Sequence, residues 1–219
     1  MWKCKIHRQT EIDPGGHAAL PVMSRIWVRS LAVPGHSQYH NALFNILLVN
    51  QMGEPMLVLR GAPALSSFRR RKLLGELQDQ VPAITDLKAE FWHFAAVDRA
   101  LDADEQALLE RLLTYGPDGS EALADGEAFL VVPRLGTISP WSSKATDIAR
   151  HCGLEAVKRL ERGVGYRVVA GAALSDHQRH QVASLLHDRM TEQVLSDFDE
   201  AEGLFREAAP RPLASVDIL

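Results

Sequence analysis

The stretch MLVLRGAPALSSF, from Met56 to Phe68, is followed 73 residues later by FLVVPRLGTISPW, from Phe129 to Trp141. At this offset Leu57 is aligned with Leu130, and Val58 is aligned with Val131. The same offset places LDADEQALLERLL (101–113) on LSDHQRHQVASLL (174–186), with three leucines matched. Two separate matches at one offset predict an internal duplication, because a fixed period is the sequence signature of a repeated structural unit.

Each repeated unit is predicted to run strand, helix, strand, helix. The last helix of each unit begins with a capping box, Asp102 with Glu105 and Ser175 with Gln178. Two such units predict an α+β fold, a two-layer α/β sandwich with internal pseudo-symmetry. The expected elements are strand 56–60, helix 66–80, strand 87–97 and helix 102–115 in unit one, and strand 129–132, helix 143–152, strand 157–169 and helix 175–188 in unit two.

Three segments are expected along the chain. Residues 1–55 contain Pro14-Gly15-Gly16 and Pro34-Gly35 and lack a sustained period, so we expect a non-domain extension, disordered or read through from upstream sequence. Residues 56–190 form the predicted domain, with units near 56–116 and 129–189. Residues 191–219 are expected to form a helical segment and the start of a linker.

Composition excludes several classes of protein. The 219 residues are 46% hydrophobic, which is enough to bury a core. A net charge of -4 gives no electrostatic case for binding nucleic acid. The longest apolar run, ALFNILLVN, is too short to cross a membrane. Cys4 and Cys152 make no disulfide framework, so a cytoplasmic location is expected.

The densest polar stretch is PRLGTISPWSSKATDIARHCGL, from Pro133 to Leu154. Ser142 or Ser143 is expected to cap the helix, with Asp147 in or near its first turn. This junction can be a capped helix, a phosphate site at a helix N-terminus, or a docking surface. The candidate residues are Arg134, Thr137, Ser139, Trp141, Ser142, Ser143, Lys144 and Asp147.

Other chemical signals are weaker. His93 lies within an alternating strand, where a histidine more often packs than catalyses. Gly163 and Gly165 lie in a strand, where glycine marks a bulge or a close approach of backbone. No arrangement typical of a catalytic triad, a nucleotide-binding glycine loop or a metal centre is found, so no catalytic and no metal-binding residue is predicted.

The Pro133–Leu154 stretch closely resembles the N-terminal domain of large-type phosphoribosylformylglycinamidine synthase, the glutamine-dependent ligase of purine biosynthesis. LRGAPALSSFRRRKLL, RLLTYGP, RLERGVGY and LLHDRMTE are also similar to that family, in the same order. The resemblance runs from Met56 to Leu219. It departs mildly from the family pattern at Trp92 and Arg150.

The resemblance implies a fold similar to a fused dimer of the small accessory subunit that other organisms keep separate. It also implies a longer enzyme that uses ATP, magnesium and glutamine to convert formylglycinamide ribonucleotide to formylglycinamidine ribonucleotide. Its synthetase and glutaminase domains would be the partners of this chain and would carry the catalytic residues. The chain alone is then expected to be an inactive, structural fragment without a cofactor. The alternative is a stand-alone module for assembly or for binding a phosphorylated metabolite.

Overall fold

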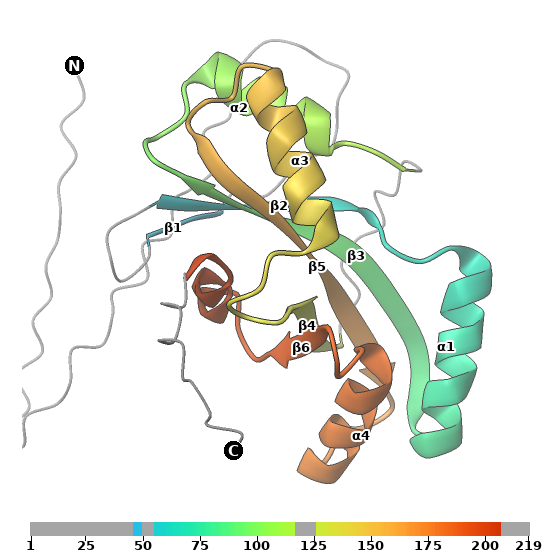
Figure 1. Ribbon diagram of the computed structural model, residues 1–219. Coiled ribbons are helices and arrows are strands. Elements are labelled where there is room, and N and C mark those ends of the chain that lie inside the picture. Colours follow the sequence, from blue (N-terminus) through green and yellow to red (C-terminus); the bar gives the residue numbers. More distant parts are fainter. Residues whose placement is uncertain (1–45, 50–54, 117–125, 207–219) are drawn as a thin grey trace, which may run out of the picture.

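The computed structural model describes residues 46–49, 55–116 and 126–206 (Figure 1). In chain order their elements are β1 (Ile46–Val49), β2 (Pro55–Pro63), α1 (Ser67–Gln80), β3 (Ile84–Val97), α2 (Ala103–Leu113), β4 (Glu127–Pro133), α3 (Pro140–His151), β5 (Val157–Ala170), α4 (Asp176–Leu186), β6 (Glu192–Leu195) and a 3-10 helix, η1 (Asp199–Phe205). From β2 onward, strands and helices alternate along the chain.

The described strands form one antiparallel sheet in the order β1-β2-β3-β5-β4-β6. The two longest strands, β3 and β5, lie at its centre with 14 residues each. Phe91 of β3 is paired with Val164 of β5, and these two residues are themselves one repeat apart. The pseudo-two-fold axis of the duplication therefore passes between them, and the predicted internal symmetry is confirmed.

Local capping explains where the helices begin. Ser66 caps α1 and Ser139 caps α3, each accepting a hydrogen bond from the backbone N–H three residues on. Asp102 and Ser175 form the predicted capping boxes at α2 and α4. Both pairs of caps are 73 residues apart. Each cap depends only on residues within one helical turn, so it can be recognised from the local sequence.

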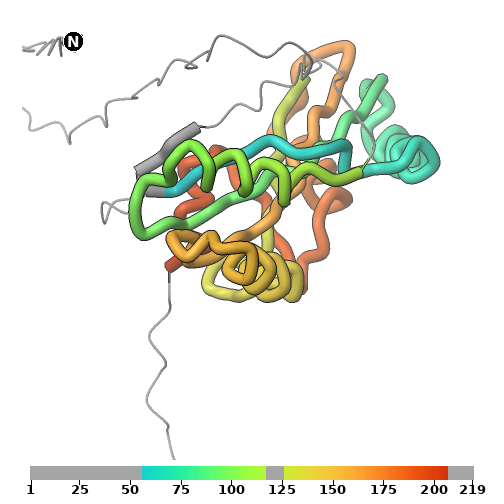
Figure 2. The backbone as a smooth tube through the Cα atoms, turned by 90° about the horizontal axis from the view of Figure 1, so that it is seen from above, coloured from blue at the N-terminus to red at the C-terminus, as the bar shows by residue number. Residues whose placement is uncertain are grey.

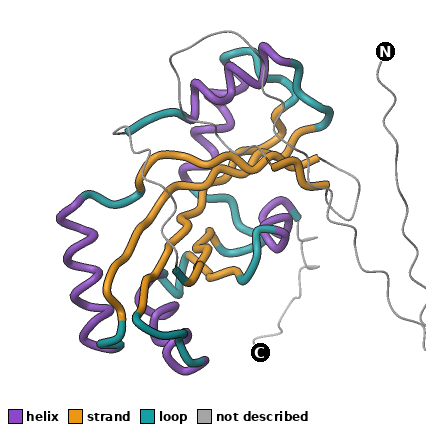
Figure 3. The backbone as a smooth tube through the Cα atoms, turned by 180° about the vertical axis from the view of Figure 1, so that it is seen from behind, coloured by secondary structure: helices purple, strands orange, loops and turns teal. Residues whose placement is uncertain are grey.

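The helices cover one face of the sheet in two pairs, which lie at opposite ends of the long strands (Figures 1 and 2). α1 and α4 pack with Leu87, Tyr166 and Val168, whereas α2 and α3 pack with Ala95 and Leu160. The other face is covered at one end by η1, over Val58 and Phe94. The strands form a single curved layer against these helices (Figure 3). The fold is thus the predicted α+β two-layer sandwich.

The register of β4 differs from the sequence match. Glu127 is paired with Val168, and Leu57 with Ala95. Because Ala95 and Val168 are one repeat apart, Glu127 takes the structural place of Leu57, at an offset of 70 residues. The matching of Leu57 with Leu130 was therefore wrong by three residues, because similar apolar residues fit several registers equally well.

The sheet extends past both expected domain boundaries. β1 lies within the expected extension and pairs with β2, although the rest of that extension, 1–45 and 50–54, lies outside the described residues. At the other end, 192–195 is strand β6 rather than helix, and it pairs with β4. Leu195 and Leu204 are buried in the cluster under η1, so these segments belong to the same core. Residues 207–219 lie outside the described part of the chain.

Candidate functional site

The connection from β4 to α3 is longer than its counterpart from β2 to α1. Five residues, 134–138, separate the end of β4 from the Ser139 cap, against two, 64–65, in unit one. This accounts for the three-residue change of offset between the strands and the helices. All five residues are exposed. Because unit one makes the same strand-to-helix connection without them, the fold itself does not require the longer loop.

The loop is nevertheless tightly held at its base. The backbone N–H of Arg134 donates to the carbonyl of Thr191 at 3.0 Å. The hydroxyl of Thr137 donates to the carbonyl of Arg134 at 2.6 Å, and Gly136 has a positive φ of 78° that glycine adopts without strain. The backbone N–H of Leu135 reaches the side chain of Gln193 at 3.4 Å. The loop therefore has one defined shape beside residues 190–193.

A buried carboxylate holds the other end of the loop. Glu161 of β5 is fully buried, and its Oε2 accepts a hydrogen bond from the Ser139 hydroxyl at 2.8 Å. Its Oε1 accepts from the Ser139 backbone at 3.3 Å and from Arg159 at 2.5 Å. Arg159 also donates to the Thr137 carbonyl at 2.6 Å. A buried charge needs such partners, and here the bonds of the pair to Ser139 and Thr137 restrain the loop.

Unit one has no equivalent of this arrangement. The positions one repeat before Glu161 and Arg159 are Lys88 and Asp86, both only half-buried. The Ser66 cap of α1 accepts its bond from Arg69 at 3.3 Å. The Glu161–Arg159 ion pair thus stabilises the particular conformation of the 134–138 loop. The sequence analysis did not predict this role for either residue.

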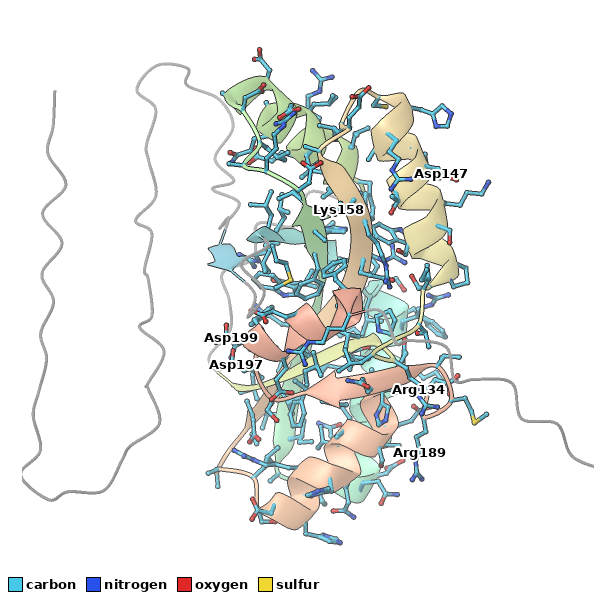
Figure 4. All side chains as sticks on the ribbon, turned by 60° about the vertical axis from the view of Figure 1, so that its left-hand side comes forward. Arg134, Asp147, Lys158, Arg189, Asp197 and Asp199 are labelled. Atoms are coloured by element: carbon cyan, nitrogen blue, oxygen red, sulfur yellow. The ribbon has the colours of Figure 1, made fainter. Side chains whose placement is uncertain are left out.

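Large apolar side chains gather on this loop and on its neighbour. Ile138 is 64% exposed, Leu135 is 40% exposed, and Met190 is 78% exposed. The guanidinium of Arg134 donates to the carbonyl of Met190 at 3.4 Å, which places the two segments side by side. Arg134 and Arg189 lie near each other on this side of the molecule (Figure 4). We call Arg134–Ile138 with Met190 the loop surface.

The structure separates the eight predicted residues into four groups. Arg134 and Thr137 belong to the loop, and Ser139 is the helix cap, which corrects the expectation of Ser142 or Ser143 because the helix begins at Pro140. Ser142 is buried beside Arg159, and Trp141 packs inward. Ser143, Lys144 and Asp147 are exposed on α3. Asp147 lies beyond the first turn, contrary to expectation, because the helix begins at Pro140, and it is well away from Arg134 (Figure 4).

The N-terminus of α3 is already occupied by the protein itself. Pro140 has no N–H, and the N–H of Ser142 donates to Ser139 Oγ at 3.0 Å. The carboxylate of Glu161 lies against the cap, where the helix dipole favours a negative charge. A phosphate group there would meet this carboxylate, so the geometry favours a docking role for the loop over an anion site.

A second polar cluster lies on the helix-covered face, beside the central Phe91–Val164 pair. His93 Nε2 is 2.7 Å from the hydroxyl oxygen of Tyr115, to which Arg162 donates at 3.1 Å. Burial, and then the charge of Arg162, lower the pKa of His93 from 6.5 to about 3. Its Nδ1 has no hydrogen bond of good geometry within the described residues. The nearby Leu59 carbonyl raises the His93 pKa, but by less than burial and Arg162 lower it. His93 is therefore a neutral, packed histidine.

Sequence analysis placed His93 correctly but missed Tyr115 and Arg162. One repeat away, His93 corresponds to Tyr166, and Arg162 to Ala89. A comparison of the two units position by position would have revealed this change from an apolar pair to a polar one. Gly61 is part of the same adaptation, because a Cβ there would lie 2.5 Å from the His93 ring.

Two further searches concern only the part of the chain that the structure describes. Within it, no three His, Cys, Asp or Glu side chains are grouped in a way that could hold a metal ion. Among its helices, none has the length and apolar character needed to cross a membrane.

Fold and site together define an internally duplicated α+β domain that carries one elaborated, rigid surface loop. The family model described as formylglycinamide ribonucleotide amidotransferase N-terminal matches residues 90–205, from within β3 to the end of η1. The match covers more than half of the 219 residues, and the protein belongs to this family. Its role is accordingly that of a part of the phosphoribosylformylglycinamidine synthase of purine biosynthesis.

Proposed function

We propose that this chain is the N-terminal structural domain of the synthase and that it docks on the enzyme's own synthetase region through the loop surface. The observation that carries the proposal is the 134–138 loop, which has no counterpart in unit one, is exposed along its length and is held by an ion pair whose carboxylate is buried. A partner's surface can bind a preorganised loop at a lower cost in conformational entropy than a loose one.

The apolar residues of the loop surface supply the binding energy in this proposal. Ile138 and Met190 would each bury apolar side chain on docking, and Arg134 and Arg189 add charge at the rim. The catalytic steps, with ATP, magnesium and glutamine, belong in this proposal to the synthetase and glutaminase domains. The chain would act in the cytoplasm and would have no ligase activity of its own.

The test is association of this chain with the separately produced synthetase region, measured by isothermal titration calorimetry. Ile138→Asp should weaken binding by about tenfold or more, since a buried anchor side chain is typically worth over 1 kcal/mol. Ile148→Asp is the matched control, because Ile148 is 53% exposed on α3 and lies outside the loop surface. Both variants should keep their unfolding temperature, since both side chains are exposed.

Equal loss of binding in both variants, or no loss in Ile138→Asp, would contradict docking through the loop. The alternative function, capture of a phosphorylated metabolite, predicts heat on titration of the free chain with formylglycinamide ribonucleotide. We expect no such heat, because Glu161 lies where the phosphate would bind. Glutamine-dependent turnover by the chain alone would contradict the assignment of catalysis to other domains.

A further inference from the structure

We propose that Arg162 is the anchor of a binding site for a carboxylate group, on the helix-covered face of the sheet beside the pseudo-two-fold axis. This site is separate from the loop surface. Its residues are Arg162, Tyr115, Phe91 and Trp141, with His93 beneath them.

Two aromatic rings hold the guanidinium in place. Its central carbon lies 4.3 Å from the ring centroid of Phe91 and 4.9 Å from that of Trp141. One of its nitrogens donates to the Tyr115 hydroxyl, which in turn lies against His93 Nε2. Arg162 donates to the Tyr115 hydroxyl whichever tautomer His93 adopts, because a guanidinium has only donors. The arginine is thus oriented before any ligand arrives.

Among the described residues, the positive charge of Arg162 has no matching negative charge. Arg60, Arg99, Arg159 and Arg179 each form an ion pair with a glutamate. Arg162 forms none within the described residues, although it is half-buried and has five N–H donors. A half-buried cation is stabilised by an anion that enters the site. The fold has no need of this charge, because unit one has Ala89 at the same place.

The chemistry of the cluster favours a carboxylate over a phosphate. Arg162 contributes a single positive charge, and the other members of the cluster are aromatic or neutral. A monoanionic carboxylate balances that charge, whereas a phosphate dianion would remain half compensated. The planar guanidinium also matches a carboxylate with two parallel hydrogen bonds. The ring faces are already in contact with Phe91 and Trp141, so the ligand approaches the edge of the guanidinium.

Nuclear magnetic resonance of the full chain, labelled with ¹⁵N, tests this site. The probes are sodium succinate, the blocked peptide acetyl-Gly-Glu-Gly-amide, and sodium phosphate, each against sodium chloride at matched ionic strength. We expect a saturable shift of the Arg162 Nε–H and Trp141 indole signals with both carboxylates, with a dissociation constant of roughly 1 mM. Tighter binding of the peptide would identify a protein side chain as the natural ligand. Tighter binding of succinate would identify a small carboxylate.

Arg162→Gln should abolish the saturable shift of the Trp141 signal, and Arg162→Lys should weaken it severalfold while keeping the charge. Arg150→Gln is the matched control, since Arg150 is exposed on α3 and its guanidinium donates to the Lys158 carbonyl. The amide spectrum shows whether each variant is folded. Shifts that stay linear with all salts, or that persist in Arg162→Gln, would overturn the proposal. Phosphate binding as tight as that of the carboxylates would overturn the choice of ligand.

Discussion

Acidification between pH 7.0 and pH 5.0 should destabilise this protein mainly through His93. Its folded-state pKa is lowered to about 3, chiefly by burial and then by the charge of Arg162, whereas the unfolded value is about 6.5. Between these two values the unfolded chain binds a proton that the folded chain does not. The stabilising contribution is therefore present above pH 6.5 and is lost as the pH falls toward 3.

The free energy of unfolding should fall by roughly 2 kcal/mol between pH 7.0 and pH 5.0. Below pH 6 it falls by about 1.4 kcal/mol per pH unit. Urea denaturation at several pH values measures it. Glu105, whose pKa is lowered to about 2 by Arg99 and by the backbone of Asp102, loses its contribution only below pH 4.5, outside this window. The pH range of 5 to 7 therefore isolates the histidine.

His93→Gln supplies the comparison, because an amide can accept from Tyr115 but cannot titrate. Over the same pH range, the fall in the free energy of unfolding should be about 2 kcal/mol smaller for the variant than for the wild type. His180→Gln, which removes an exposed histidine of α4, should follow the wild type. If the wild type and His93→Gln lost stability equally, the reasoning on His93 would be refuted. Its imidazole signal should also show no protonation above pH 4.

Three other substitutions test an ion pair, a close contact between strands and a positive φ. Glu161→Ala should lower the free energy of unfolding by about 3 kcal/mol in urea denaturation, because it leaves Arg159 unpaired; a change below 1 kcal/mol would show that the pair is dispensable. Gly165→Ala should cost about 1–3 kcal/mol, because its Cβ would lie 2.5 Å from the Trp92 indole, and the tryptophan fluorescence should change with it. Gly153→Ala should lower stability by about 1 kcal/mol through its positive φ of 94° alone, since a Cβ there meets open space; an unchanged unfolding temperature would contradict this.

The two glycines of β5 show that a sequence can predict a close contact correctly without identifying the residue that makes it. Gly163 and Gly165 were expected to mark a bulge or a close approach, and close approach is confirmed at both. Gly165 lies against Trp92, and a Cβ on Gly163 would lie 2.8 Å from the Val131 carbonyl. The sequence has no means of naming these contacts, because the residues lie on neighbouring strands far apart in the chain.

In the candidate site, too, the sequence identified the residues but not their contacts. The sequence singled out the stretch after β4 by its polar density, and it gave Ser139 and Trp141 as candidates for contact with a ligand or another domain. Ser139 instead caps the helix and bonds to Glu161, and Trp141 packs inward beside His93 and Arg162. Their orientation depends on where β5 lies, and no local pattern contains that information.

The sequence by itself determined the duplication, the alternation of strand and helix within each repeated unit, and the starts of α1, α2 and α4. Capping bonds join residues three apart, and the repeat of 73 residues needs no partner to be recognised. Only the tertiary structure decided the register of β4, the length of the 134–138 loop and the burial of Glu161. These depend on pairing and packing between distant residues: several registers suit one apolar strand, and the chosen one is set by the strands, helices and charges that surround it.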